Sequence, residues 1–158
     1  MDRKLVDAYA AGANKVAEAI VGLGREGFLK FPVAGTWSIG QIVIHLMDSD
    51  LIASDRMKRI IAEDRPTLIG YNESLFGERL FYDQLDIQLA CDIFAKNRQL
   101  TYEILRRLPD TAFERVGCHN EVGDKTLAQF VKTYVDHLRY HLTFIERKRG
   151  LLGKPLAI

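Results

Sequence analysis

Four long segments in which an apolar residue recurs every three or four positions constrain the fold of this chain more than any other feature. They extend over about Asp2–Arg25, Ser38–Glu63, Tyr82–Leu108 and Thr126–Gly150. Nowhere does the chain alternate apolar and polar residues for long, as a strand would. The second and fourth segments begin with the capping-box patterns Ser-x-x-Gln and Thr-x-x-Gln, which mark helix N-termini. The sequence therefore predicts an all-α fold, a four-helix bundle.

The connection between the second and third predicted helices, RPTLIGYNESLFGERLF at residues 65–81, is long for a helical bundle. A connection of that length can cross the whole height of the bundle, so that the second and third helices run parallel. We therefore predict the order up-down-down-up, with a long crossover between helices two and three. The 158 residues fit one domain, spanning 1–158.

The composition argues against several classes of function. Basic residues number 22 and acidic residues 21, so the net charge is +1 and no basic surplus favours nucleic-acid binding. Two basic clusters, 106–107 and 147–149, are interpreted as solvated helix ends, where cations complement the helix dipole. The two cysteines make no disulfide framework, and no run of about 18 apolar residues suits a membrane span. We expect a cytoplasmic protein with no nucleic-acid or membrane partner.

Three of the four histidines lie on helix faces that are otherwise apolar. His137 and His141 are one helical turn apart and continue the stripe of Phe130 and Tyr134 in the fourth segment. His45 follows Ile42 by three positions on the inward face of the second helix. The spacing therefore points all three imidazoles into the bundle.

The crossover topology decides whether these three histidines can meet. His45 lies about seven residues after the start of its helix, and His137 and His141 lie about nine to thirteen residues before the end of theirs. If the two helices are antiparallel, the histidines lie at the same level along the bundle to within about two residues. If the helices are parallel, the histidines are further apart. Three neutral imidazoles at one point match the ligand shell of a zinc-type ion with open coordination positions. The alternative is that they are core residues with satisfied hydrogen bonds.

Four further residues are candidates for positions beside such a site. Asp48 and Ser49 lie one turn after His45, where a carboxylate can orient a ligating imidazole, although Asp48 can equally be solvated. Asn97 falls on the apolar stripe of the third helix and is either buried near the site or partly exposed. His119 lies in the irregular stretch before the fourth helix, where it either reaches the mouth of the bundle or stabilises a turn.

A tryptophan and a serine precede the histidine of the second helix, and His-x-x-x-His follows near the C-terminus. This layout resembles the DinB-like superfamily, also called DinB/YfiT, over nearly the whole chain. The segments that carry the resemblance are TWSIGQIVIHLMDSD (36–50), AEDRPTLIGYNESLF (62–76), NRQLTYEILRRL (97–108) and TLAQFVKTYVDHLRYHLTFIERKR (126–149).

The resemblance implies a metal-binding bundle in which His45, His137 and His141 match the family's three-histidine ligand set. It also implies a divalent ion, zinc or nickel first and iron or manganese next, and a homodimer. Family members are mostly described as metal-dependent hydrolases, and some relatives are transferases or isomerases that use a thiol such as bacillithiol, mycothiol or glutathione. We therefore predict a metal-dependent hydrolase of a small-molecule substrate. The alternatives are a thiol S-transferase and a non-catalytic bundle for small-molecule binding or dimerisation.

Overall fold

The computed structural model describes residues 3–156 of the chain. Its helices are α1 (Lys4–Ala11), α2 (Lys15–Ala19), α3 (Arg25–Leu29), α4 (Ile39–Ala62), α5 (Glu73–Arg79), α6 (Ile87–Leu105) and α7 (Leu127–Leu151), with a 3-10 turn η1 (Asp110–Glu114). Its strands are β1 (Thr67–Leu68), β2 (Val116–His119) and β3 (Gly123–Thr126). No helix among the described residues is long and apolar enough to cross a membrane.

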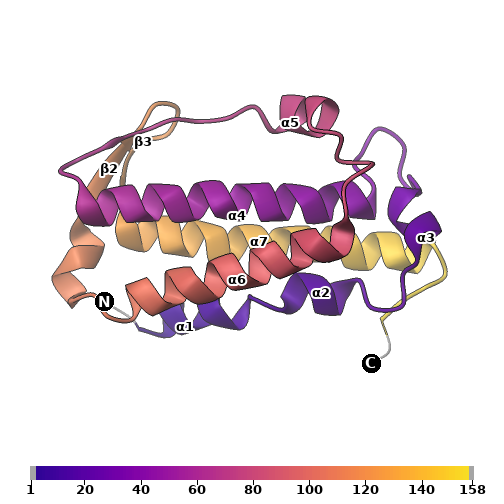
Figure 1. Ribbon diagram of the computed structural model, residues 1–158, viewed down its shortest axis with the longest axis horizontal. Coiled ribbons are helices and arrows are strands. Elements are labelled where there is room, and N and C mark those ends of the chain that lie inside the picture. The colour runs from indigo at the N-terminus through magenta and orange to yellow at the C-terminus, as the bar shows by residue number, and fades with distance from the viewer. Residues whose placement is uncertain (1–2, 157–158) are drawn as a thin grey trace.

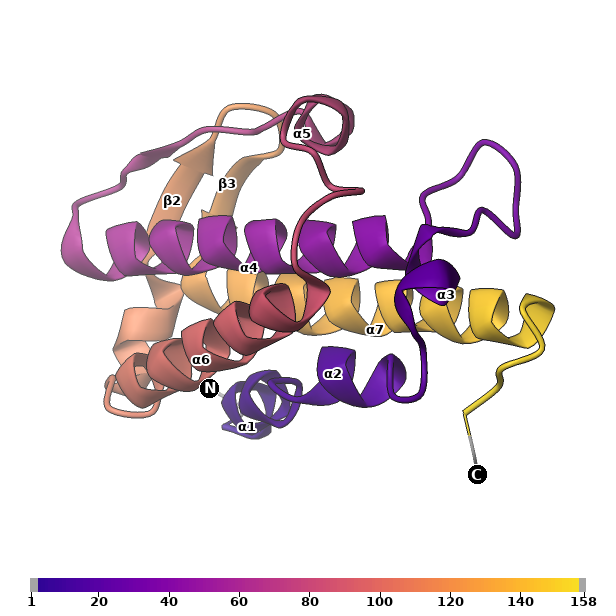
Figure 2. The same ribbon diagram turned by 45° about the vertical axis from the view of Figure 1, so that its right-hand side comes forward.

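The helices form a four-helix bundle in which α4, α6 and α7 are the long members and α1 and α2 together occupy the fourth position (Figure 1). Helices α4 and α6 run in the same direction and α7 runs opposite to both, as Figures 1 and 2 show. The connection from α4 to α6 passes along the outside of α4 and carries α5. The predicted all-α bundle and its up-down-down-up order with a long crossover are therefore confirmed.

The capping boxes place the starts of the two helices that carry the histidines. The Ser38 hydroxyl accepts the Gln41 backbone N–H at 3.2 Å, and the Gln41 side chain accepts the Ser38 backbone N–H at 2.9 Å. Thr126 and Gln129 make the same pair of hydrogen bonds, at 3.2 and 2.9 Å. Because these contacts are local, the predicted boundaries of α4 and α7 agree with the structure to within one or two residues.

The first predicted helix, residues 2–25, is wrong as a single element. Its predicted start at Asp2 lies outside the described residues, and beyond that the chain turns between α1 and α2 and again before α3. The Arg98 guanidinium of α6 donates to the Tyr9 carbonyl at 3.4 Å, in competition with the helical bond that this carbonyl would accept. Gly12 lies at the break, where a Cβ atom would come within 2.5 Å of the same guanidinium.

The third predicted helix, residues 82–108, also begins too early and ends too late. Helix α6 starts after Asp86, whose carboxylate accepts the Leu89 backbone N–H at 3.0 Å and so caps the N-terminus. Tyr82 lies in the preceding turn and donates its hydroxyl to Asp48 at 2.7 Å.

A small sheet of order β1-β2-β3 adds strands that the periodicity did not predict. β1 pairs parallel to β2, with Leu68 opposite His119, and β2 pairs antiparallel to β3. The Gly70 backbone N–H donates to the Asn120 side chain at 2.7 Å just beyond the paired residues. The sheet therefore fastens the beginning of the crossover to the hairpin that precedes α7, and places His119 at a defined position.

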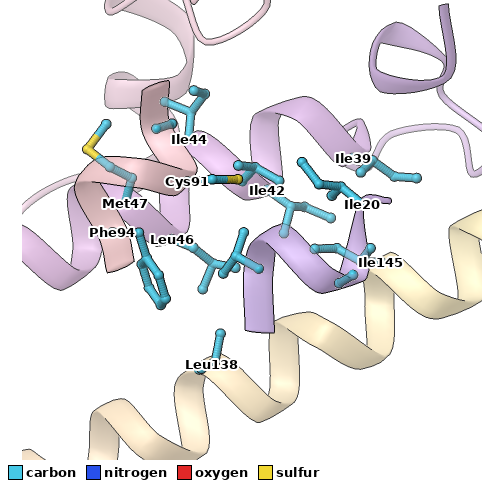
Figure 3. Packing of buried hydrophobic residues seen from close by; sticks show 14 of the residues in the cluster. Ile20, Ile39, Ile42, Ile44, Leu46, Met47, Cys91, Phe94, Leu138 and Ile145 are labelled. Atoms are coloured by element: carbon cyan, nitrogen blue, oxygen red, sulfur yellow. The ribbon is translucent and has the colours of Figure 1, made fainter. Parts of the chain in front are cut away.

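The core of the bundle consists of two clusters of buried apolar side chains. In the cluster of Figure 3, Leu138 and Ile145 project from α7 toward side chains of α4 such as Ile42 and Leu46. Each of these four side chains is at least 95% buried. Complete burial of one such side chain stabilises the fold by about 1.5–3 kcal/mol, so the cluster fixes how α4 and α7 face each other.

Candidate metal centre

Three histidines from two antiparallel helices meet inside the bundle. His45 lies on α4, and His137 and His141 lie one turn apart on α7. One ring nitrogen from each lies within 4.8 Å of the others, and the Nε2 atoms of His45 and His137 are 3.2 Å apart. The ring centroids are separated by 4.5–5.2 Å. The structure therefore brings together the three residues that the sequence singled out.

The three imidazoles are buried in a way that keeps them neutral. His45 is completely buried, and the other two are partly buried. Burial lowers the pKa of His45 to about 3 and those of His137 and His141 to about 4. The pKa value for His45 also includes the effect of the neighbouring His141 and His137. At neutral pH each ring therefore keeps a lone pair available for a cation.

Two of the ring nitrogens have no partner in the protein. The Nδ1 atoms of His45 and His141 are buried, and neither makes a hydrogen bond. Histidines that serve only as core residues need partners for such atoms, because a buried unsatisfied polar group costs about 1–3 kcal/mol. Three neutral imidazoles that converge in this way fit a borderline divalent cation such as zinc or nickel.

A hollow of about 180 Å³, called here the polar hollow, lies on the His137 side of the cluster. His119 and His137 both line it, together with Ser49, Arg56, Tyr71 and Glu73. The Tyr71 hydroxyl is buried, and burial raises its pKa to about 12. Polar side chains that face a space beside the histidines are the arrangement expected where a polar substrate group is bound.

A second hollow of about 210 Å³, called here the apolar hollow, lies on the His141 side. Val33, Trp37, Ile42 and Phe144 supply apolar parts of its wall. The Trp37 ring also packs against His45, with the two ring centroids 4.8 Å apart. The histidine cluster is therefore flanked by two hollows of different chemistry.

The family to which this chain belongs follows from its sequence as a whole. The sequence profile of the DinB superfamily matches residues 8–145, a range that contains all three histidines of the cluster. The chain belongs to the DinB superfamily.

Two relatives in the DinB superfamily illustrate the range of similarity. A protein from Oceanobacillus iheyensis named "Putative metal-dependent hydrolase" is 30% identical over 112 residues, which cover 71% of this chain and 64% of that protein. A protein of the same name from Bacillus mycoides is 26% identical over 140 residues, covering 89% of this chain and 80% of the relative. This chain thus spans less than two thirds of the Oceanobacillus relative.

The fold of this DinB-superfamily chain agrees with a solved structure, YfiT from Bacillus subtilis. The two superimpose with a TM-score of 0.89 at 22% sequence identity, over 95% of this chain and 86% of YfiT. YfiT is described as "a probable metal-dependent hydrolase with an unusual four-helix bundle topology". At this identity the match establishes the shared fold.

The four other candidate residues of this DinB-superfamily protein have different surroundings in the structure. Ser49 and His119 line the polar hollow, and the His119 Nδ1 atom accepts the Glu121 backbone N–H at 3.2 Å. Asp48 accepts the Tyr82 hydroxyl instead of orienting a histidine. The Asn97 side chain donates to the Asp50 carboxylate at 2.8 Å, so it belongs to a neighbouring network.

That network has at its centre a buried ion pair that the sequence did not reveal. Arg98 of α6 donates to the Asp50 carboxylate of α4 at 2.8 Å, with side chains 1% and 2% exposed. The same guanidinium donates to the Tyr134 carbonyl of α7 at 2.8 Å. Since Tyr134 precedes His137 by three residues, the ion pair links α4 and α7 close to the cluster.

The interpretation of residues 147–149 as a solvated helix end is wrong for two of the three. Lys148 and Arg149 are each only 4% exposed. The Arg149 guanidinium donates to the Val21 carbonyl at 2.9 Å, while Lys148 donates to the Thr36 hydroxyl at 2.6 Å. Lys148 lies seven residues after His141, so the helical spacing that located the histidines also locates this lysine on the inward face.

Proposed function

We propose that this protein is a divalent-metal-dependent hydrolase whose ion is held by His45, His137 and His141. The convergence of three neutral imidazoles, with one ring nitrogen of each within 4.8 Å of the others, is the observation that carries the proposal. The names of the relatives, which describe metal-dependent hydrolases, support the reaction class. Zinc and nickel suit imidazole ligands best, and iron and manganese are the next candidates.

A divalent ion in such a site supplies Lewis acidity, which activates water and polarises the oxygen of an ester, amide or phosphoryl group. The three histidines occupy fixed positions because α4 and α7 are held together by the core and by the Asp50–Arg98 ion pair. With only three protein ligands, the site keeps open positions for water and substrate.

The polar hollow is the place for the reacting group in this proposal. His119 faces it from β2, and its Nδ1 atom is occupied as the acceptor of the Glu121 backbone N–H. Burial and the Arg56 charge lower the pKa of His119, so the ring is neutral and carries its proton on Nε2. We assign His119 the role of a hydrogen-bond donor, whose Nε2–H stabilises the negative charge that develops on the reacting oxygen.

The test is turnover by protein loaded with zinc or nickel, on a panel of p-nitrophenyl esters, an anilide and a phosphodiester. We expect hydrolysis that disappears when the ion is removed by a chelator and returns when it is restored. A parallel assay combines a low-molecular-weight thiol with an electrophile such as monochlorobimane. Metal-dependent consumption of the thiol without hydrolysis of any ester, anilide or phosphodiester would replace the hydrolase proposal by the S-transferase alternative.

A further inference from the structure

The apolar hollow contains two positive charges for which the described residues supply no acidic partner. Arg147 and Lys148 both line it, beside His141 of the histidine cluster. Within residues 3–156, no ion pair joins either cation to a carboxylate. The position of the two cations matters because a cation without a counter-ion next to an apolar surface attracts an anion from solution.

Lys148 is the more unusual of the two cations because it is almost completely buried. Its ammonium group has three donors and gives one of them to the Thr36 hydroxyl at 2.6 Å. The Thr36 hydroxyl in turn donates to the Val33 carbonyl at 2.9 Å, so it acts toward Lys148 as a neutral acceptor. Burial and the nearby Arg147 charge lower the pKa of Lys148. A neutral hydroxyl does not compensate the burial of a full charge.

The remaining wall of the hollow is aromatic and aliphatic and reaches the histidine cluster. The Phe144 ring lies 6.0 Å from the His141 ring, and the Trp37 ring lies 4.8 Å from the His45 ring. The volume of about 210 Å³ is smaller than the roughly 300–1,000 Å³ of pockets for drug-sized ligands. A molecule bound there is therefore short, largely apolar, and directly beside the proposed metal ligands.

We propose that the apolar hollow binds the part of the substrate that does not react: a short apolar body ending in an anionic group such as a carboxylate. The anion contacts Lys148 and Arg147, the apolar body packs on Trp37 and Phe144, and the reacting bond lies at the histidines. This assignment of a substrate class rests on the proposed function. It adds that the protein selects small amphiphilic anions over neutral molecules of the same length.

The test uses hexanoate and hexan-1-ol as probes of equal chain length that differ in charge. Trp37 is the only tryptophan in the chain and lines this hollow, so binding there can be followed by tryptophan fluorescence. The titration uses metal-free protein at constant ionic strength, with isothermal titration calorimetry to detect a complex that leaves the fluorescence unchanged. We expect hexanoate to bind at least about tenfold more tightly than hexan-1-ol, the effect of one charge-assisted hydrogen bond.

Two variants with a matched control test the role of the cations. Lys148→Met keeps the length of the apolar stem, and we expect it to fold and to lose the preference for hexanoate. Arg147→Gln is expected to weaken hexanoate binding about threefold to tenfold, because this residue is exposed and screened. Arg139→Gln changes an exposed arginine two turns earlier on α7 and should leave the affinity unchanged.

Equal binding of the two probes, or an unchanged preference in Lys148→Met, would overturn the inference. Metal content measured on the same protein separates this failure from failure of the proposed function. If the protein binds hexanoate selectively but takes up no metal, the anion site is supported and the proposed hydrolase function is refuted. If the protein takes up metal but does not prefer hexanoate to hexan-1-ol, only the proposed anion site is refuted.

Discussion

The Nε2 atoms of His45 and His137 lie 3.2 Å apart, although the residues are 92 positions apart in the sequence. Two neutral imidazoles in this arrangement can share one proton, one ring donating and the other accepting. His141 adds a third ring within 4.8 Å. The parallel course of α4 and α6 leaves α7 antiparallel to α4, and this topology is what brings the three rings to the same height in the bundle.

The metal-free protein should lose stability in mild acid. The pKa values of the three histidines are about 3–4 in the folded chain and about 6.5 in the unfolded chain. Between these values the unfolded state binds more protons, so the free energy of unfolding falls as the pH decreases from about 6.5 to about 4. Each histidine contributes up to about 1.4 kcal/mol per pH unit. Urea unfolding at several pH values measures this.

The variant His137→Gln isolates the contribution of the cluster from that of carboxylates elsewhere. It should show a shallower fall in the free energy of unfolding over the same pH range. A slope equal to that of the wild type would mean that His137 becomes protonated at its ordinary pKa in the folded protein.

Breaking the buried ion pair should be far more costly than breaking an exposed one on the same helix. Asp50→Asn leaves the Arg98 charge buried without a counter-charge, and we expect a loss of about 3–5 kcal/mol in the free energy of unfolding. Asp55→Asn makes the same chemical change in an ion pair with Arg59 whose side chains are 61% and 47% exposed. It should cost less than about 1 kcal/mol. Similar losses for both variants in urea titrations would contradict the account.

A methyl group at Gly12 should be destabilising, in contrast to the same change at Gly150. The added Cβ atom would lie 2.5 Å from the Arg98 guanidinium and 2.7 Å from the Leu138 side chain. Arg98 cannot move away because it is bound to Asp50 and to the Tyr134 carbonyl. Gly12→Ala should therefore cost about 1–3 kcal/mol.

Gly150 is the control because it is helical and a Cβ atom there meets nothing within 4 Å. Gly150→Ala should leave the stability unchanged or raise it by up to about 1 kcal/mol, through the greater helix propensity of alanine. Thermal unfolding of both variants gives the comparison, and a stable Gly12→Ala protein would show that Arg98 is not fixed.

The variant His119→Ala separates hydrogen-bond donation to the reacting group from metal binding. If His119 donates this hydrogen bond, kcat should fall about 10²–10³-fold while the metal content stays that of the wild type. Val122→Ala changes an exposed residue close to His119 in the chain, between β2 and β3, and should retain full activity. Loss of the ion in His119→Ala would instead assign this residue to the metal shell.

Much of this architecture could be predicted because its signals are local. The capping boxes place the starts of α4 and α7, and helical spacing places His45, His137 and His141 on inward faces. The length of the crossover then leaves one topology in which the histidines meet.

The features that could not be predicted depend on contacts between distant parts of the chain. At the break after α1 the Tyr9 carbonyl accepts a hydrogen bond from Arg98, which lies 89 residues later in the sequence. The Asp50–Arg98 ion pair joins two different helices, and the sequence alone does not identify the partner of either residue. Lys148 is a different case. Its spacing from His141 in the sequence indicates an inward position, but its positive charge favoured the interpretation that it is solvated.

Metal content by mass spectrometry, on protein purified without a histidine tag, shows whether His45, His137 and His141 hold an ion. Wild type and His141→Ala are compared, with circular dichroism to confirm that both remain helical. We expect about one divalent ion per chain in the wild type and loss of that ion in the variant. Absence of any ion in the wild type, even after incubation with zinc or nickel, would contradict this expectation and make the three histidines core residues.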